Sequence, residues 1–203
     1  MGMYQREVQP RLVNLVMGSE GRREIRERVC AGLCGNVVEV GYGSGLNQPH
    51  LPPEVSGVWA VEPSAVALRL AARRRAASPT PVVLGGGNAQ DMPFRDGRFD
   101  AALSTWTMCG IADPAAALRE LARVLKPGGT LHFVEHGLAE DESVARWQRR
   151  GNALNKALAG CALDRDVRSL LEASPLTLTW MHAYYEAGAA KPARYHYEGR
   201  AVA

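Results

Sequence analysis

The chain lacks the features that mark secreted, membrane-spanning and nucleic-acid-binding proteins. Its four cysteines form no Cys-x-x-Cys pair and do not suggest a small cross-linked scaffold, which predicts reduced thiols in a cytoplasmic protein. No apolar run approaches the ~18 residues of a membrane span and no leader pattern is present, so we expect a soluble protein without membrane insertion. The net charge of +3, from 24 basic and 21 acidic side chains, is too small to predict binding to nucleic acid.

The 203 residues have the length and the patterning of one α/β domain. Short β-branched runs alternate with longer helical stretches, which is typical of a mostly parallel sheet with helices on both faces. We expect seven strands, at residues 36–40, 58–61, 82–84, 100–105, 130–135, 176–182 and 193–198. We expect helices within residues 4–33, broken at Gly18 and Gly21, and at 65–75, 114–125, 143–158 and 164–173.

A glycine-rich turn directly after the first strand is the strongest local signal. From Glu39 to Gly45 the sequence reads Glu-Val-Gly-Tyr-Gly-Ser-Gly. Glycines at alternate positions let the backbone turn tightly and approach a ligand that a Cβ would exclude. Backbone amides there suit a carboxylate, and the acidic residue before the first glycine suits an ammonium group. A ligand that carries both groups is an amino acid, and S-adenosylmethionine ends in one.

The spacing of these glycines separates the turn from that of dinucleotide-binding enzymes. Those enzymes use Gly-x-Gly-x-x-Gly leading straight into a helix whose N-terminus faces a pyrophosphate. Here the third glycine comes one residue earlier, and Pro49, Pro52 and Pro53 interrupt the segment that follows. The spacing therefore argues against a nicotinamide oxidoreductase.

The next two strands also end in polar residues. Glu62 ends the second strand, where an acidic side chain can accept hydrogen bonds from both ribose hydroxyls. Asn88, Ala89 and Gln90 follow the third strand, where a polar side chain can read the edge of an adenine ring. Three strand ends in succession thus carry polar features at the edge where an open α/β sheet binds ligands.

Together these segments resemble the motifs of class I S-adenosylmethionine-dependent methyltransferases. The resemblance continues at residues 99–103 and 119–129, and it covers the chain from Tyr4 to Glu135. The chain departs from the family at Asn88, where the family usually has Asp, although an asparagine oxygen can still accept a hydrogen bond. The resemblance implies S-adenosylmethionine as cofactor and S-adenosylhomocysteine as product. It places the cofactor on Tyr4, Glu39, Gly41, Tyr42, Gly43, Gly45, Asn47, Glu62, Pro63, Asn88, Ala89, Gln90, Thr105 and Trp106.

The later part of the chain resembles a narrower branch of this family. Residues 107–111, 133–136 and 160–166 resemble small bacterial methyltransferases, which are similar to animal membrane-attached enzymes that alkylate small thiols. The chain is more distantly similar to the C-methyltransferases of ubiquinone and menaquinone biosynthesis. We therefore expect methylation of a small, largely apolar acceptor, with a thiol favoured. C- or O-methylation of a quinone-like or phenolic metabolite, and a catalytically silent S-adenosylmethionine-binding protein, are the alternatives.

Candidate residues for the acceptor side follow the fourth and fifth strands. His136 is the candidate base, because the pKa of an imidazole lies near neutral pH. Glu135 and Arg165 are candidates either to orient His136 or to hold the substrate. Trp106, Cys109, Arg165 and His196 are the candidates for contact with the acceptor. His132 and His136 lie about 13 Å apart along a strand at ~3.3 Å per residue, so we expect no metal shared between them and no metal site.

We expect a single methyltransferase domain with three parts. Residues 1–33 would form a helical lid, residues 34–136 the cofactor-binding half and residues 137–203 the acceptor side. The expected partner is a small molecule, and the expected oligomeric state is a monomer or homodimer. Methylation of nucleic acid is not expected, because Ser-Thr-Trp-Thr at residues 104–107 replaces an Asn-Pro-Pro-Tyr type of motif.

Overall fold

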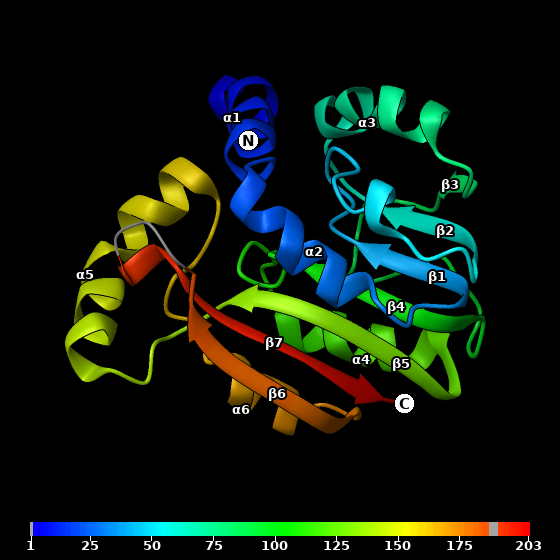
Figure 1. The fold of residues 1–203 in the computed structure, drawn as a ribbon. Coiled ribbons are helices and arrows are strands. Elements are labelled where there is room, and N and C mark those ends of the chain that lie inside the picture. The colour runs from blue at the N-terminus through cyan, green and yellow to red at the C-terminus, as the bar shows by residue number, and fades with distance from the viewer. Residues whose placement is uncertain (1, 187–190) are drawn as a thin grey trace.

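Seven strands form one sheet in a computed structural model that describes residues 2–186 and 191–203 (Figure 1). The order across the sheet is β3-β2-β1-β4-β5-β7-β6. Strands β1 to β5 pair in parallel, and β7 runs antiparallel to both β5 and β6. The strands are β1 (Gly35–Val40), β2 (Val55–Val61), β3 (Val82–Leu84), β4 (Phe99–Thr105), β5 (Leu125–His136), β6 (Thr177–Tyr185) and β7 (Tyr195–Val202). The expectation of a mostly parallel seven-stranded sheet is confirmed. Residues 1 and 187–190 of the expected lid and acceptor side lie outside the described residues.

Helices cover both faces of the sheet. Figure 1 shows α1, α2 and α3 on one side, α4 and α6 on the other, and α5 beyond one end of the strands. The α-helices are α1 (Gln9–Met17), α2 (Arg23–Cys30), α3 (Ala65–Ala77), α4 (Pro114–Val124), α5 (Glu142–Ala159) and α6 (Val167–Glu172). Short turns of π- or 3₁₀-helix occur at Tyr4–Val8, Glu20–Arg22, Gln48–His50 and Lys191–Ala193. No helix among the described residues combines the length and apolar character needed to cross a bilayer.

Local signals in the sequence explain where several helices begin and end. The side chain of Ser64 caps α3 by accepting the amide of Ala67, and that of Asp113 caps α4 by accepting the amide of Ala116. Gly160 ends α5 with a φ of +75°, a conformation that glycine adopts without strain. Strand β5 begins at Leu125, five residues before the expected start at position 130, with an irregular register against β4. Gly128 and Gly129 therefore belong to β5, which is longer than expected.

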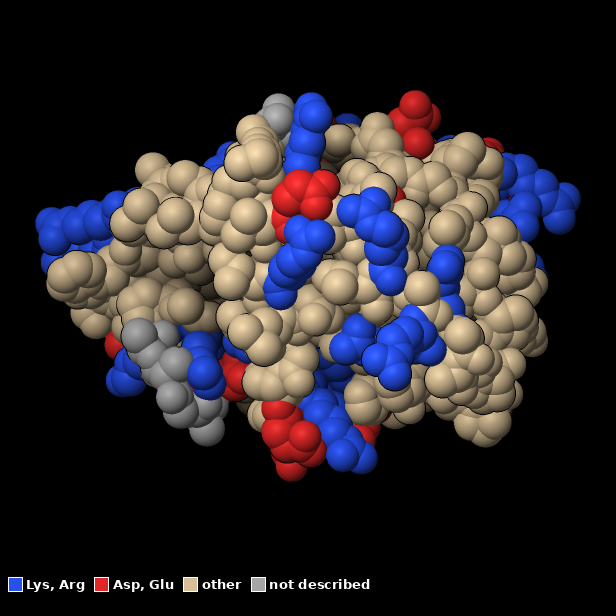
Figure 2. Space-filling view, turned by 90° about the horizontal axis from the view of Figure 1, so that it is seen from above, with Lys and Arg blue, Asp and Glu red and all other residues tan. Residues whose placement is uncertain are grey.

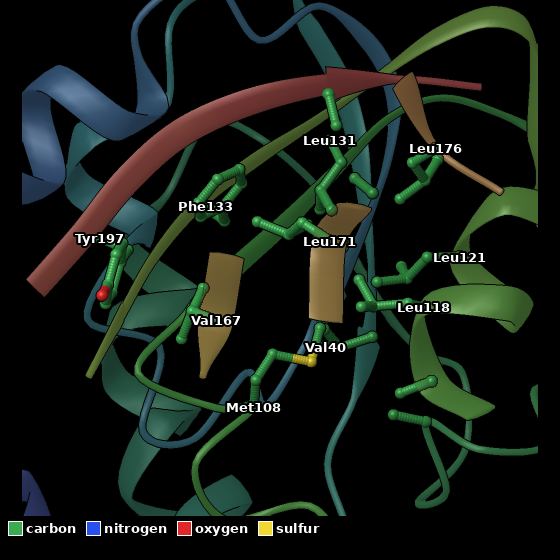
Figure 3. Close-up of a cluster of buried hydrophobic side chains, with 14 of the residues drawn as sticks. Val40, Met108, Leu118, Leu121, Leu131, Phe133, Val167, Leu171, Leu176 and Tyr197 are labelled. Carbon is green, nitrogen blue, oxygen red and sulfur yellow. The ribbon is translucent and has the colours of Figure 1, made fainter. Parts of the chain in front are cut away.

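The larger of two apolar clusters fills the space between the sheet and helices α4 and α6 (Figure 3). Strand residues such as Val40 and Phe133 point toward Leu121 of α4 and Leu171 of α6, and each is at most 4% exposed. A second cluster lies on the opposite face, under α2. Because both faces of the central strands are covered, the sheet is rigid and its strand ends can position functional groups.

Candidate cofactor and acceptor site

A cavity of about 1050 Å³ opens at the carboxyl ends of the parallel strands. The turns after β1, β2, β3 and β4 line it, together with α1 and the end of α5. Figure 2 shows a hollow in the upper face beside α5, and the basic side chains on this face are spread among acidic and neutral ones. The volume lies at the upper end of the ~300–1000 Å³ range of small-molecule sites. It can therefore hold a cofactor and a small second substrate.

The glycine turn after β1 forms one wall of the cavity. Gly41, Gly43 and Gly45 have φ values of +68°, +57° and +73°. A Cβ at Gly41 would overlap the side chain of Thr107, so that position needs glycine for space as well as for conformation. At Gly43 the nearest atom to a Cβ would be 3.6 Å away, so its conformation alone favours glycine there. The turn thus leaves the backbone uncovered toward the cavity.

A buried polar network lies behind this turn, centred on Asn47. The Nδ2 atom of Asn47 donates to Glu39 Oε1 at 2.8 Å and to Thr105 Oγ1 at 2.9 Å. Its Oδ1 atom accepts from Arg26 Nη1 at 2.5 Å. Burial raises the pKa of Glu39 to about 7, and burial lowers the pKa of Arg26 to about 10. Glu39 Oε2 has no hydrogen-bond partner among the described residues.

Glu62, at the end of β2, is held in one orientation by two backbone amides. Its Oε2 atom accepts from Gly43 N at 2.8 Å, and its Oε1 atom accepts from Ser64 N at 2.7 Å. Burial raises the pKa of this carboxyl, while the two amides act in the opposite direction. The carboxylate lines the cavity next to the glycine turn.

The segment after β3 also lines the cavity through Asn88, Ala89 and Gln90. Asn88 Oδ1 accepts from both the backbone and the side-chain nitrogen of Gln90, at 3.0 and 3.1 Å. Gln90 Oε1 accepts from Asp113 N at 2.7 Å, which ties this segment to the start of α4. The amide group of Asn88 faces this edge as an exposed polar group.

Trp106 follows β4 and lines the cavity. Its φ of +50° is the only positive value among the non-glycine residues that the structure describes, which marks a strained backbone. The indole Nε1 donates to His196 Nε2 at 3.2 Å, and the guanidinium of Arg26 lies 4.8 Å from the ring centroid. These two contacts fix the orientation of the ring.

Cys109, His136 and Cys161 meet at the wall of the same cavity. One ligand atom from each lies within 4.8 Å of the other two, and Cys161 Sγ lies 3.6 Å from His136 Nδ1. Burial lowers the pKa of His136 well below its usual value, and His196 and Arg22 lower it further. A hydrogen bond between the Cys109 and Cys161 thiols that favours the protonated form of Cys109, together with burial, raises the pKa of the Cys109 thiol.

Besides Glu135, five residues expected at the site do not line this cavity: Glu39, Gly45, Tyr4, Arg165 and His196. Glu39 lies in the buried network behind the glycine turn. Tyr4 does not line the cavity, and its hydroxyl donates to the Leu158 carbonyl of α5 at 2.9 Å. Arg165 donates to the Ile111 carbonyl and lines a separate cavity. His196 is 0% exposed, because the rings of Trp106, His136 and Tyr184 pack around it, and it supports Trp106 instead of lining the cavity.

The expected pairing of Glu135 with His136 is also wrong. Adjacent residues on a strand point to opposite faces of the sheet, so the two side chains diverge. Glu135 Oε1 accepts from Ser104 Oγ at 2.6 Å, and its Oε2 accepts from the backbone amide of Met108 at 3.0 Å. The pKa of this fully enclosed carboxyl is raised to about 8 by burial. Glu135 therefore holds the turn that carries Cys109 in place.

The structure also brings two arginines to the site that were not among the expected residues. Arg22 and Arg26 are 6% and 5% exposed and line the cavity from the start of α2. Arg22 pairs with Glu186 at 3.3 Å. The sequence contains a signal for this placement. Positions 22 and 26 are four residues apart and lie on the face of the helix where Ile25 and Val29 are buried. Basic residues on a buried helix face are uncommon and point to a functional contact.

Comparison with known proteins relates the chain to methyltransferases. Residues 38–133 match a family model described as a methyltransferase domain. A thiol S-methyltransferase of Homo sapiens is 31% identical over 144 residues, which are 68% of this chain and 58% of that protein. A demethylmenaquinone methyltransferase of Symbiobacterium thermophilum is 37% identical over 106 residues, 49% of this chain and 42% of that protein. The chain spans about half the length of these curated relatives.

A solved structure extends the likeness over nearly the whole chain. A SAM-dependent methyltransferase of Thermotoga maritima matches with a TM-score of 0.67 and 21% identity, and the match covers 95% of this chain and 93% of that one. At this identity the similarity concerns the fold alone. The likeness thus includes the antiparallel end of the sheet, which lies outside the matched methyltransferase domain.

Proposed function

The chain belongs to the class I methyltransferase family, and on that premise we propose that it transfers the methyl group of S-adenosylmethionine to a small, largely apolar acceptor, with a thiol favoured. The observation that carries the proposal is one cavity that runs from the glycine turn after β1 to an apolar region beside α5. Bound S-adenosylmethionine supplies an electrophilic methyl group on a sulfonium. The protein must place that group in line with the accepting atom and exclude competing water.

The polar network behind the glycine turn fits the amino-acid end of the cofactor. Gly43 carries no side chain, and the nearest atom to a Cβ there would be 3.6 Å away, which leaves room for a ligand to approach the backbone. Glu39 Oε2 is buried and has no hydrogen-bond partner among the described residues. It can therefore accept a hydrogen bond from an ammonium group of a ligand. We assign the carboxylate end to Arg26, whose guanidinium lines the cavity and remains protonated at neutral pH.

The other two strand ends fit the rest of the cofactor. Glu62 offers a carboxylate already oriented by two amides, which suits the two hydroxyls of a ribose. Asn88 offers an exposed amide beside Ala89 and Gln90, which suits the edge of an adenine ring. In this assignment the turns after β1, β2 and β3 hold the amino-acid end, the ribose and the adenine of S-adenosylmethionine, respectively.

The far region of the cavity suits a small apolar acceptor. Its lining there includes Ile111, Leu158, Ala159 and Leu163. A thiol with a pKa near ~8.5 is already a few per cent ionised at neutral pH, so alignment can supply much of the rate acceleration. His136 as a base stays a prediction, and its Nδ1 atom already faces Cys161.

A quinone-like or phenolic metabolite, methylated on carbon or oxygen, is the second candidate acceptor. The similarity to a demethylmenaquinone methyltransferase favours it. We prefer the thiol because the similarity to the thiol S-methyltransferase extends over 68% of this chain, against 49% for the quinone relative. A catalytically silent binder of S-adenosylmethionine is the remaining alternative.

The test is transfer of labelled methyl groups from S-adenosylmethionine to a panel of small thiols, phenols and quinols. We expect label on an alkyl or aryl thiol, with S-adenosylhomocysteine formed in equal amount. Label on a quinol or phenol alone would favour the second candidate. Tight cofactor binding by calorimetry with no transfer to any compound of the panel would contradict both and favour the silent binder. Glu54→Gln, an exposed change distant from the cavity, serves as the control variant.

A further inference from the structure

Cys109, His136 and Cys161 come from three separate parts of the chain and converge at one point. Cys109 lies in the turn after β4, His136 ends β5, and Cys161 follows α5. Their ligand atoms lie within 4.8 Å of one another. We infer that these three side chains form a binding site for a thiophilic divalent cation, zinc by the chemistry of the ligands.

The distance between the Cys161 sulfur and the His136 ring nitrogen fits tetrahedral zinc. Zinc–sulfur bonds of ~2.3 Å and zinc–nitrogen bonds of ~2.0–2.1 Å at a tetrahedral angle place sulfur and nitrogen ~3.6 Å apart. Cys161 Sγ and His136 Nδ1 are 3.6 Å apart. The Nε2 atom of His136 has no hydrogen-bond partner among the described residues, so no other group fixes the ring in the opposite tautomer. Two thiolates also neutralise the charge of a divalent cation.

The backbone around both cysteines is fixed, as a preorganised metal site requires. The Ala162 amide donates to the carbonyl of Cys109 at 2.9 Å, which joins the two cysteine-bearing segments directly. Asn155 Nδ2 donates to the carbonyl of Cys161 at 2.6 Å. The buried Glu135 carboxylate accepts the amide of Met108, next to Cys109. Each sulfur therefore reaches the site from a segment that hydrogen bonds hold in place.

Three protein ligands leave the fourth tetrahedral position open. Structural zinc sites use four protein ligands, whereas catalytic sites use three and keep the fourth for water or substrate. All three residues line the same cavity as the glycine turn, so the open position faces the space assigned to the acceptor. This part of the inference rests on the proposed function.

The chemistry that follows is activation of an acceptor thiol. A thiol that takes the open position binds the cation as thiolate, and its proton passes to solvent. The sulfur electron pair then forms a bond to the methyl carbon while the bond from that carbon to the sulfonium sulfur breaks. The products are a thioether, which is a weaker ligand than a thiolate, and neutral S-adenosylhomocysteine. His136 serves here as a ligand, and no protein base is needed.

The first experiment measures metal binding by the full chain, without any acceptor. The protein is reduced with a phosphine, loaded with Co²⁺ as a spectroscopic probe for zinc, and desalted. We expect a thiolate-to-cobalt absorption band and tetrahedral d–d bands, with loss of both on addition of Zn²⁺. Cys109→Ser, Cys161→Ser and His136→Asn should each weaken zinc binding at least ~10-fold in competition with a chelator dye. Cys34→Ser, a change at an exposed cysteine outside the cavity, is the matched control and should bind zinc as the wild type does.

Wild-type spectra without cobalt–thiolate absorption would overturn the inference, as would equal zinc affinity in the three site variants and the wild type. If a serine variant fails to fold, Cys161→His replaces it. That change keeps three ligands and should reduce the charge-transfer band by about half, because one of two sulfurs is lost. An unchanged band would also overturn the assignment.

A second experiment separates the metal site from the methyl transfer itself. A small thiol added to the cobalt-loaded protein should increase the charge-transfer absorption, because a further sulfur enters the open position. No change in the spectrum would overturn the open-site assignment. Methyl transfer that persists after complete removal of metal by a chelator would overturn the role of the cation and leave the proposed function intact. Metal and thiol binding without any methyl transfer would instead contradict the proposed function.

Discussion

The carboxylate of Glu62 accepts the backbone amide of Gly43 at 2.8 Å, and this bond joins the end of β2 to the glycine turn after β1. Both groups face the same cavity. An acidic side chain expected to bind a ribose therefore also holds the turn that we expect to approach the cofactor. Its second oxygen is held by Ser64 N at 2.7 Å, so the carboxylate is oriented before any ligand arrives.

Glu62→Gln should weaken cofactor binding more than it weakens the fold. The variant keeps one carbonyl oxygen but places an amide donor against a backbone amide donor, and hydrogen bonds to charged groups contribute roughly 1.5–3 kcal/mol. We expect the dissociation constant of S-adenosylhomocysteine to rise at least ~10-fold by calorimetry. Glu54→Gln, an equivalent change at an exposed position, is the control. Equal affinity in both variants would show that Glu62 has no part in the binding.

Gly41→Ala should cost more stability than an alanine at another glycine of similar backbone. Gly41 and Gly97 have φ values of +68° and +60°, which cost an alanine roughly 1–2 kcal/mol. A Cβ at Gly97 has no atom within 4 Å, whereas one at Gly41 overlaps Thr107. Urea unfolding should therefore show an additional loss of ~1–3 kcal/mol for Gly41→Ala. Equal losses would contradict the close packing of the turn against Thr107.

The free energy of unfolding should fall as the pH rises from 6.5 to 8. Burial raises the pKa of Glu39 to about 7 and that of Glu135 to about 8, above the ~4.3 of an unfolded glutamate. The folded protein then binds more protons than the unfolded chain, so stability is lost as these carboxyls ionise. Below pH ~6.5 the buried histidines act in the opposite direction, because burial lowers the pKa of His132 to about 4 and that of His196 to about 3.

Urea unfolding of the wild type at several pH values measures this effect. A difference of one bound proton between the folded and the unfolded protein over one pH unit corresponds to ~1.4 kcal/mol. We therefore expect the free energy of unfolding to fall by an amount on the order of 1–2 kcal/mol. Glu39→Gln removes one of the two carboxyls and should flatten the fall between pH 6.5 and 7.5. Stability that increases over this range would show that the two carboxyls are ionised in the fold at ordinary pH.

Removal of residues 1–18 should weaken cofactor binding and leave a folded domain. Leu12 and Val13 of α1 line the cavity, although each is more than 40% exposed, and α1 contributes no residue to the two buried clusters. We expect the shortened chain to unfold cooperatively and to bind S-adenosylhomocysteine ~10-fold less tightly, since the lid no longer excludes water. Leu15→Ser, at a position on α1 that is 74% exposed and outside the cavity lining, should bind normally. Unchanged affinity in the shortened chain would show that residues 1–18 do not act as a lid over the cofactor.

The sequence by itself determined the fold and the residues at the ends of the first three strands that line the cavity. Hydrophobic runs with a strand or a helix period, the cap at Ser64 and the glycines from Gly41 to Gly45 are local signals, and each acts over a few neighbouring residues. Because parallel strands end at one edge of a sheet, locating Glu62 and Asn88 at strand ends was enough to predict that both line one cavity. The opposite directions of Glu135 and His136 also follow from strand geometry, so the alternation of side chains along a strand already argues against their pairing.

Only the tertiary structure decided which distant residues meet around Cys109, His136 and Cys161. Cys109 and Cys161 are 52 positions apart, and their approach to His136 depends on where α5 ends and how the loop after it returns to the sheet. The stacking of Arg26 on Trp106 depends likewise on the placement of α2 across the strand ends. Such contacts result from packing between elements, and packing leaves no periodic or local pattern in the sequence because many sequences satisfy the same core.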